Sequence, residues 1–165
     1  MKLSQNSPRQ LDSLNQLAKK IVNLAREKNL SVCTAESCTG GLIASSLVSV
    51  VGASDIFKGS LVCYSLESKN QILKIPNSIV KENSAVNEKC VLLMAKNAAK
   101  IFNCNYSISS TGFAESGGEI FLCVYSKKSS LIKKVSYKLS RNLSRKEAAK
   151  ESLQMLLDAL SCCKV

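Results

Sequence analysis

Residues 34–41 read TAESCTGG, and this stretch decides the fold because it separates a strand pattern from a helix pattern. The segment LSVCTAE, residues 30–36, alternates as a strand does. The segment TGGLIASSLVSV, residues 39–50, continues as a helix whose small residues allow close packing on a sheet. In an open α/β sheet, ligands bind beyond the carboxyl ends of the strands. Ser37 lies at such an end, so it is the first candidate for a functional residue.

Two roles are compatible with the residues around Ser37. Gly40 and Gly41 would let the backbone approach a substrate closely, and the positive end of the following helix would favour an anion or a developing oxyanion. Ser37 would then be a nucleophile. In the other role, Ser37 or Thr39 only caps the helix through its hydroxyl group. The stretch alone does not decide between these roles.

Helices and strands alternate on either side of this stretch, and two strands then follow each other late in the chain. Pro76 is expected to end one helix, and Asn87 is a suitable N-cap for another. The order predicts a three-layer α/β/α sandwich with a mixed, mostly parallel sheet. Residues 1–8 are expected to form a flexible N-terminus and residues 9–165 a single domain. The other expected elements are helices over 11–28, 67–75, 87–103 and 144–160 and strands over 56–65, 105–110, 119–126 and 130–139.

The composition is that of a globular protein. Of 165 residues, 45% are hydrophobic and 21% are charged, and no apolar run approaches the roughly 20 residues that cross a bilayer. The first ten residues, MKLSQNSPRQ, lack the apolar core of a signal peptide. We therefore expect a cytoplasmic protein that does not bind a membrane.

Histidine is absent, and the eight cysteines are scattered without a C-x-x-C pair. A zinc site would need widely separated thiolates or carboxylates, so we expect no metal, and we expect no cofactor. The cysteines are interpreted as reduced core residues. Without histidine, a general base must be a lysine, a carboxylate, a tyrosine or a thiolate.

The net charge of +11 comes from 23 basic and 12 acidic side chains. Such a charge suits an anionic partner, either nucleic acid or a phosphorylated small molecule. The lysines are spread along the chain, however, and only four Phe and four Tyr are available for base stacking. A solvated, lysine-rich surface is the better interpretation, and we do not expect direct binding of nucleic acid.

Several stretches together resemble the CinA C-terminal family, the competence/damage-inducible domain that is identified with nicotinamide-nucleotide amidase. The likeness begins at TAESCTGG and continues through GASDIFKGSLVCYSLESK, residues 52–69, where the family pattern runs G-S-S-x-x-F-x-x-G-x-V-x-Y-S-N-E-x-K. It includes STGFA, residues 110–114. It also includes LSRNLSRKEAAKESLQMLL, residues 139–157, which is similar to the family's G-D-R-x-x-x-R segment and last helix. Because these motifs occur in order over most of the chain, the fold is expected to be CinA-like.

This resemblance implies hydrolysis of nicotinamide mononucleotide to nicotinate mononucleotide and ammonia, within pyridine-nucleotide salvage. Carried over by motif, Ser37 is the nucleophile, Lys69 is its base, and Tyr64 is a third catalytic residue. The expected partners are the small nucleotide substrate and a second copy of the chain in a homodimer. The substrate-binding residues implied by the motifs are Thr39, Gly40, Gly41, Ser54, Thr111, Gly112 and Arg141.

A Ser–Lys pair suits amide hydrolysis without histidine. An amide is a poor electrophile, so its hydrolysis needs an activated oxygen nucleophile and a proton for the leaving ammonia. A lysine that is neutral in the working enzyme supplies both. We therefore expect Ser37 and Lys69 in one pocket, with the ammonium form of Lys69 disfavoured by burial or by a neighbouring cation. Arg141 could be that cation, although binding the substrate's phosphate is the more natural task for a guanidinium.

The chain departs from the family pattern in the glycine-rich loop. The family sequence T-G-I-A-G-P-G-G reads TGFAESGG here, residues 111–118, and the K-P-V-G segment before the next strand is missing. Leu66 also replaces the asparagine of Y-S-N-E. A shorter loop would open the pocket, and Glu115 would repel a phosphate if it pointed inward. Two alternatives therefore stay open: a catalytically weakened CinA-like interaction domain, and an accessory protein in competence or DNA repair.

Overall fold

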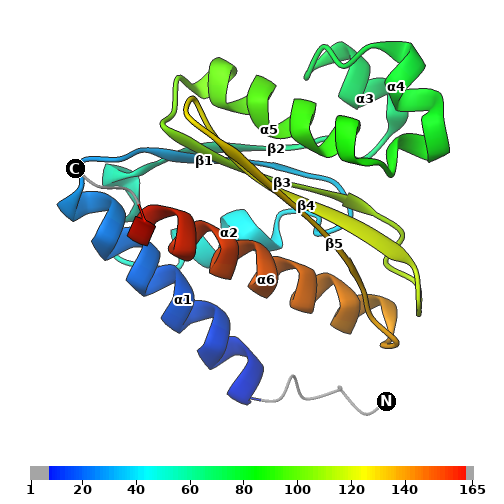
Figure 1. The fold of residues 1–165 in the computed structure, drawn as a ribbon. Helices are drawn as coiled ribbons and strands as arrows, with labels where there is room; N and C mark the ends of the chain where they lie inside the picture. Colours follow the sequence, from blue (N-terminus) through cyan, green and yellow to red (C-terminus); the bar gives the residue numbers. More distant parts are fainter. Residues whose placement is uncertain (1–7, 163–165) are drawn as a thin grey trace.

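The computed structural model describes residues 8–162, so residues 1–7 of the predicted flexible N-terminus lie outside the described part. Its first helix begins at Pro8. Proline is well suited to the first helical position, because the N–H that it lacks would have no intrahelical partner there. Figure 1 shows the order of the elements. They are α1 Pro8–Glu27, β1 Val32–Glu36, α2 Leu42–Val48, η1 Ala53–Asp55, β2 Phe57–Val62, α3 Leu66–Gln71, α4 Asn77–Lys81, η2 Glu82–Ala85, α5 Glu88–Phe102, β3 Tyr106–Gly112, β4 Glu119–Ser126, β5 Ser130–Ser136 and α6 Arg141–Cys162.

The five strands form one mixed sheet in the order β2-β1-β3-β4-β5. β1 pairs in parallel with β2 and with β3, whereas β4 is antiparallel to both β3 and β5. The two parallel pairs are joined through helices, and the later strands follow each other through short connections, as each geometry requires. The predicted α/β sandwich with a mixed sheet is confirmed, with two of its four strand pairings parallel.

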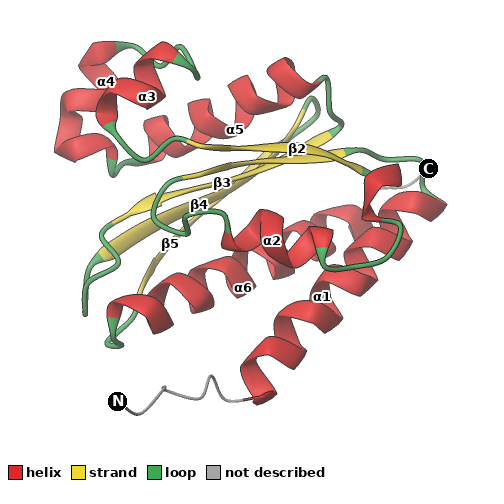
Figure 2. Cartoon of the chain, turned by 180° about the vertical axis from the view of Figure 1, so that it is seen from behind, coloured by secondary structure: helices red, strands yellow, loops and turns green. Residues whose placement is uncertain are grey.

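Helices cover both faces of the sheet, as Figure 2 shows from behind. α1, α2 and α6 pack on one another over one face, and α3, α4 and α5 lie over the opposite face. The first face has a core that includes Ile21, Ile108 and Leu156, and the second has a core that includes Leu73 and Met94. All five of these side chains are fully buried, and each such burial contributes about 1.5–3 kcal/mol. The two cores fix the sheet between them.

β1 is the strand that both cores share. Val32 belongs to the core under α1 and α6, and Cys33 and Ala35 belong to the core under α5. All five residues of β1 are buried, as is usual for a central parallel strand. Thr34 and Glu36 are therefore polar groups inside the fold, and each must find a partner there.

The segment around Pro76 differs from the prediction. The predicted helix over 67–75 is shorter, because α3 ends at Gln71 and Lys74 has a left-handed φ of 53°, which no α-helix can continue. Pro76 does not end a helix but is the N-cap of α4, which was not predicted. The last helix, α6, begins at Arg141, three residues before its predicted start.

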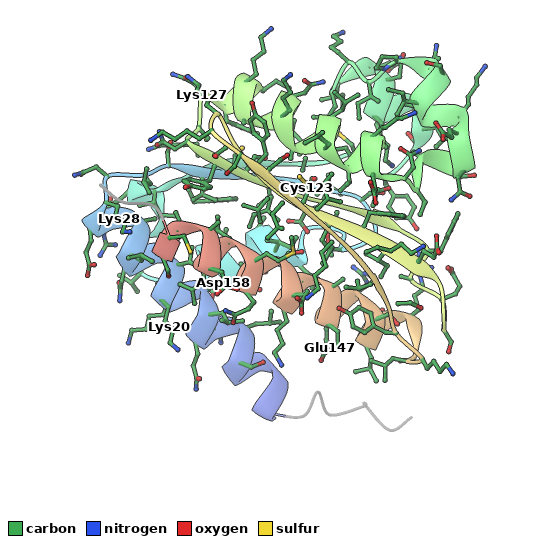
Figure 3. All side chains as sticks on the ribbon, in the orientation of Figure 1. Lys20, Lys28, Cys123, Lys127, Glu147 and Asp158 are labelled. Carbon is green, nitrogen blue, oxygen red and sulfur yellow. The ribbon has the colours of Figure 1, made fainter. Side chains whose placement is uncertain are left out.

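Lysine side chains extend from several parts of the surface, with Lys20, Lys28 and Lys127 labelled in Figure 3. Cys123, also labelled, lies inside the fold on β4, and burial raises the pKa of its thiol to about 12. Six of the seven described cysteines are buried, and all seven are free thiols. Within residues 8–162, every helix is too short or too polar to cross a membrane.

Candidate active site

The carboxyl ends of β1, β2 and β3 meet at one edge of the sheet. Glu36, the last residue of β1, is paired in register with Val62 of β2 and with Ser110 of β3. The next residue along the chain, Ser37, therefore lies close to the residues that follow these two strands. Its N–H donates to the carbonyl of Ser110 over 3.0 Å, which fixes the backbone of the loop at this edge.

Ser37 and Lys69 meet at this edge, as predicted. The hydroxyl oxygen of Ser37 lies 3.0 Å from the amine nitrogen of Lys69, and the same amine donates to the carbonyl oxygen of Tyr64 over 3.2 Å. The two side chains are buried, with 6% of Ser37 and 2% of Lys69 exposed. Lys69 reaches back from α3, whose first turn is capped by the hydroxyl of Ser65, which accepts the N–H of Ser68 over 3.0 Å.

Burial lowers the pKa of the Lys69 amine, because an ammonium ion loses most of its hydration inside the fold. The neighbouring thiols of Cys90, Cys63 and Cys38 act in the opposite direction. A neutral amine has two N–H groups and one lone pair. Since the carbonyl of Tyr64 accepts one N–H, the lone pair can receive the hydroxyl proton of Ser37. The pair therefore has the geometry of a nucleophile and its general base.

Lys69→Met is expected to stabilise the fold. Because the folded-state pKa of Lys69 lies below its unfolded value, folding buries an ammonium ion at low pH, and this penalty disappears as the pH rises towards the unfolded pKa. The melting temperature should rise by about 2 to 4 °C for each kcal/mol of penalty removed, most strongly at pH values below the folded-state pKa, and the rise should shrink as the pH increases towards the unfolded pKa. Lys96→Met, an exposed lysine of α5, is the control. A lower melting temperature in Lys69→Met, at every pH, would contradict the burial penalty.

The Ser–Lys pair opens into a cavity of about 210 Å³. Val86 and Phe113 give it an apolar wall, and Thr111 and Gly112 line it from the end of β3. Thr111 is buried, and its hydroxyl donates to the carbonyl of Ala85 over 2.9 Å, so only part of this residue faces the cavity. Of the residues that the motifs implied, the structure brings Ser37, Lys69, Tyr64, Thr111, Gly112 and Arg141 together around one cavity.

Arg141, at the start of α6, lies at the wall of the cavity with both ends of its guanidinium occupied. One nitrogen forms an ion pair with the carboxylate of Glu115, and the other donates to the hydroxyl of Tyr64 over 2.8 Å. The side chains of Arg141 and Glu115 are 48% and 63% exposed. Glu115 does point to the cavity, but its carboxylate is bound to the cation that was expected to bind phosphate.

Four of the implied substrate-binding residues lie elsewhere. Thr39 is fully buried, and the N–H groups of Gly40 and Gly41 are already bonded within the loop. Ser54 is an exposed residue of η1, which precedes β2. Because β1 and β2 are parallel, Ser54 lies at the opposite edge of the sheet from Ser37. These four residues do not line the cavity.

Glu36 is the residue that sequence reasoning missed. Its buried carboxylate accepts the backbone N–H groups of Gly41 and Ala44, each over 2.8 Å, and that of Ile43 over 3.2 Å. It also accepts the hydroxyls of Thr34 and Thr39. The carboxylate therefore occupies the start of α2, so the expectation that this helix end serves a substrate anion or an oxyanion is wrong. The N-cap position of α2 is Gly41, so neither Ser37 nor Thr39 is the capping residue.

Arg145 is a second missed residue, one turn after Arg141. Its guanidinium donates to the carbonyls of Cys38 and Thr39, each over 3.0 Å, and so ties the loop of the nucleophile to α6. Gly40 leaves room for this arginine, because a Cβ atom there would lie 2.8 Å from its terminal nitrogen. The R-x-x-x-R spacing places both arginines on one face of a helix, and this was the signal that could have identified Arg145.

A strained turn forms part of the cavity wall. Three successive residues, Asn83, Ser84 and Ala85, have left-handed φ angles of 46°, 53° and 65°. Each such angle costs a residue with a side chain about 1–2 kcal/mol. The turn is held by the bond from Thr111 to the carbonyl of Ala85 and by the amide of Asn83, which donates to the carbonyl of Val86 over 2.9 Å. It places Ser84 at the cavity.

The fold and this site define an α/β/α domain with a buried Ser–Lys pair at the carboxyl edge of a mixed sheet. Residues 14–160 match the family model of the CinA C-terminal domain, and the chain belongs to the CinA family.

Known members of this family match most of the chain but are longer. A CinA-like protein of Pseudothermotoga lettingae is 31% identical over 153 residues, which cover 88% of this chain and 38% of that protein. A CinA-like protein of Fervidobacterium nodosum is 45% identical over 98 residues, covering 59% of this chain and 24% of that protein. The chain thus spans about a quarter to two fifths of the length of these relatives.

Solved structures of competence/damage-inducible proteins share the fold. The competence/damage inducible protein CihA from Agrobacterium tumefaciens aligns with a TM-score of 0.85 and 27% identity, over 98% of this chain and 99% of that one. The competence damage-inducible protein A from Klebsiella pneumoniae aligns with a TM-score of 0.87 and 20% identity, over 92% and 99% of the two chains. The first of these likenesses supports the family assignment, and the second shows the fold alone.

Proposed function

We propose that this chain is a Ser–Lys amidohydrolase that hydrolyses nicotinamide mononucleotide to nicotinate mononucleotide and ammonia. The observation that carries the proposal is the 3.0 Å contact between the Ser37 hydroxyl and a buried Lys69 amine at the wall of a cavity. A lysine is an expensive residue to bury, and this one is placed where its neutral form acts as a base. Membership of the CinA family is consistent with this activity.

The reaction follows from the geometry in two halves. The hydroxyl oxygen of Ser37 attacks the carbonyl carbon of the amide while its proton passes to the Lys69 amine. The resulting ammonium then protonates the leaving nitrogen, the C–N bond breaks, and ammonia departs from a serine ester. Lys69, neutral again, removes a proton from water, whose oxygen attacks the ester carbonyl. The bond between that carbon and the Ser37 oxygen then breaks, the Lys69 ammonium returns its proton to this oxygen, and the carboxylic acid is released. Amide and water thereby give acid and ammonia, and both residues return to their starting state.

The cavity also suits the ring that carries this amide. Phe113 and Val86 provide apolar surface for a flat aromatic ring, and an aromatic side chain favours stacked or edge-to-face contact with such a ring. Arg141 lies at the same cavity and is the residue that would bind a phosphate. We further propose that the protein works in the cytoplasm and forms a homodimer, as the sequence resemblance suggests.

Ammonia release from nicotinamide mononucleotide tests the proposal. We expect the nucleotide to be hydrolysed, with free nicotinamide at least about a hundredfold poorer in kcat/KM, because it lacks the ribose and phosphate whose binding energy orients the amide. The dinucleotide is measured beside them as a third substrate. The rate should rise with pH as Lys69 becomes neutral. No ammonia from any of the three would leave the interaction domain or the accessory protein as the better reading.

A further inference from the structure

The guanidinium of Arg141 is already engaged before any substrate binds. Glu115 forms an ion pair with one of its nitrogens, and the hydroxyl of Tyr64 accepts from the other. Among the described residues that line the cavity, the charged ones are Lys69, Glu115 and Arg141. Lys69 acts as a base only when it is neutral, so Arg141 is the cation left for an anionic group of the substrate.

Glu115 and a phosphate compete for the same donors. Carboxylate and phosphate oxygens both match the planar fork of a guanidinium, so Arg141 cannot give its full set of bonds to both. The ion pair is half exposed, and exposed pairs are weak enough to be displaced by a substrate.

We infer that Glu115 is a specificity-determining residue, which competes with the phosphate of the substrate for Arg141 and so lowers the preference of this chain for the phosphorylated form of the amide. This inference rests on the proposed function. The expected substrate is therefore an amide whose ring is recognised by the cavity. Its phosphate contributes less binding free energy than it would at an arginine without a carboxylate partner.

The test compares Glu115→Gln with the wild-type chain on two substrates, nicotinamide mononucleotide and nicotinamide riboside, which lacks the phosphate. The ratio of kcat/KM for the nucleotide to kcat/KM for the riboside should rise about tenfold in Glu115→Gln, mainly through a lower KM for the nucleotide. Glu119→Gln is the matched control, because it removes the same charge four residues along the chain, where Glu119 pairs with Lys134 outside the cavity. Its ratio should stay within about twofold of the wild-type value.

A second comparison establishes that the effect passes through Arg141. Arg141→Ala should raise KM for the nucleotide more than it lowers kcat, and adding Glu115→Gln to it should leave the ratio unchanged. In the Ser37→Ala background, which cannot turn over, Glu115→Gln should tighten the Kd for nicotinamide mononucleotide by a similar factor.

The outcomes separate the two proposals. If the wild-type chain releases ammonia but Glu115→Gln leaves the ratio unchanged, the inference is overturned and the proposed function stands. The same holds if Glu119→Gln raises the ratio equally. A rise in the ratio that persists in the Arg141→Ala background would show that Glu115 does not act through Arg141, and it would also overturn the inference. Absence of ammonia from both substrates in the wild-type chain would overturn the proposed function and, with it, the inference.

Discussion

Ser37→Ala is expected to lower the rate of ammonia release by at least about 10⁴-fold while leaving the fold intact. Under the proposed mechanism the hydroxyl is the attacking group, and no other described residue holds a nucleophilic oxygen against the Lys69 amine. Stability should change little, because Ser37 is not the capping residue of α2 and the Lys69 amine keeps its bond to the carbonyl of Tyr64. Assays of ammonia and of melting temperature on the same preparation measure both effects.

Two further variants make this test specific. Lys69→Ala should be nearly as inactive as Ser37→Ala, and the double variant little worse than either, because nucleophile and base act as one unit. Ser49→Ala, at the other end of α2, is the control for removal of a hydroxyl and should keep its activity. Activity near the wild-type level in Ser37→Ala would refute the mechanism.

Glu36→Gln is expected to reduce the free energy of unfolding by roughly 3 to 5 kcal/mol. The two carboxylate oxygens of Glu36 accept five hydrogen bonds, three of them from backbone N–H groups of the loop and of α2. A glutamine keeps one acceptor oxygen and turns its NH₂ group towards N–H or O–H donors. Several buried donors then lose their partner, and each costs much of its desolvation free energy.

Denaturation in urea with and without the substitution gives this difference directly. Glu67→Gln is the matched control, because Glu67 is an exposed residue in the first turn of α3 and its loss should change the free energy of unfolding by less than about 0.5 kcal/mol. A loss below about 1 kcal/mol in Glu36→Gln would show that the loop is held in another way.

The sequence predicted the elements whose periodicity is set by burial. β1 and α5 were found because their apolar residues recur at the spacing of a strand and of a helix, and Asn87 caps α5 as predicted, accepting the N–H of Cys90 over 2.8 Å. α4 was missed because five residues after a proline are too few to show a helical period. Pro76 is equally compatible with the end and with the start of a helix.

The site was predicted only in part, because its motifs identify residues but not what they bond to. Ser37 and Lys69 are 32 positions apart in the chain, and only the parallel pairing of β1 and β2 brings them to one edge. A buried glutamate such as Glu36 looks like any surface acid in a sequence. The pairing of Glu115 with Arg141 joins residues 26 positions apart, and no local pattern encodes such a contact.

The Ser–Lys pair and the residues that line the rest of the cavity come mainly from different parts of the chain. Under the proposed mechanism, the bond-breaking pair comes from one contiguous strand–helix–strand–helix unit, residues 32–69, which is anchored from within by Glu36. The rest of the cavity wall comes mainly from later parts of the chain, namely Ser84 and Val86, residues 111–113 with Glu115, and Arg141 at the start of α6. Mutational drift in those later segments can therefore redirect the chain to a new substrate while the reaction itself is inherited unchanged. Descendants of one ancestral gene could in this way share a chemistry and differ in the metabolite that each consumes.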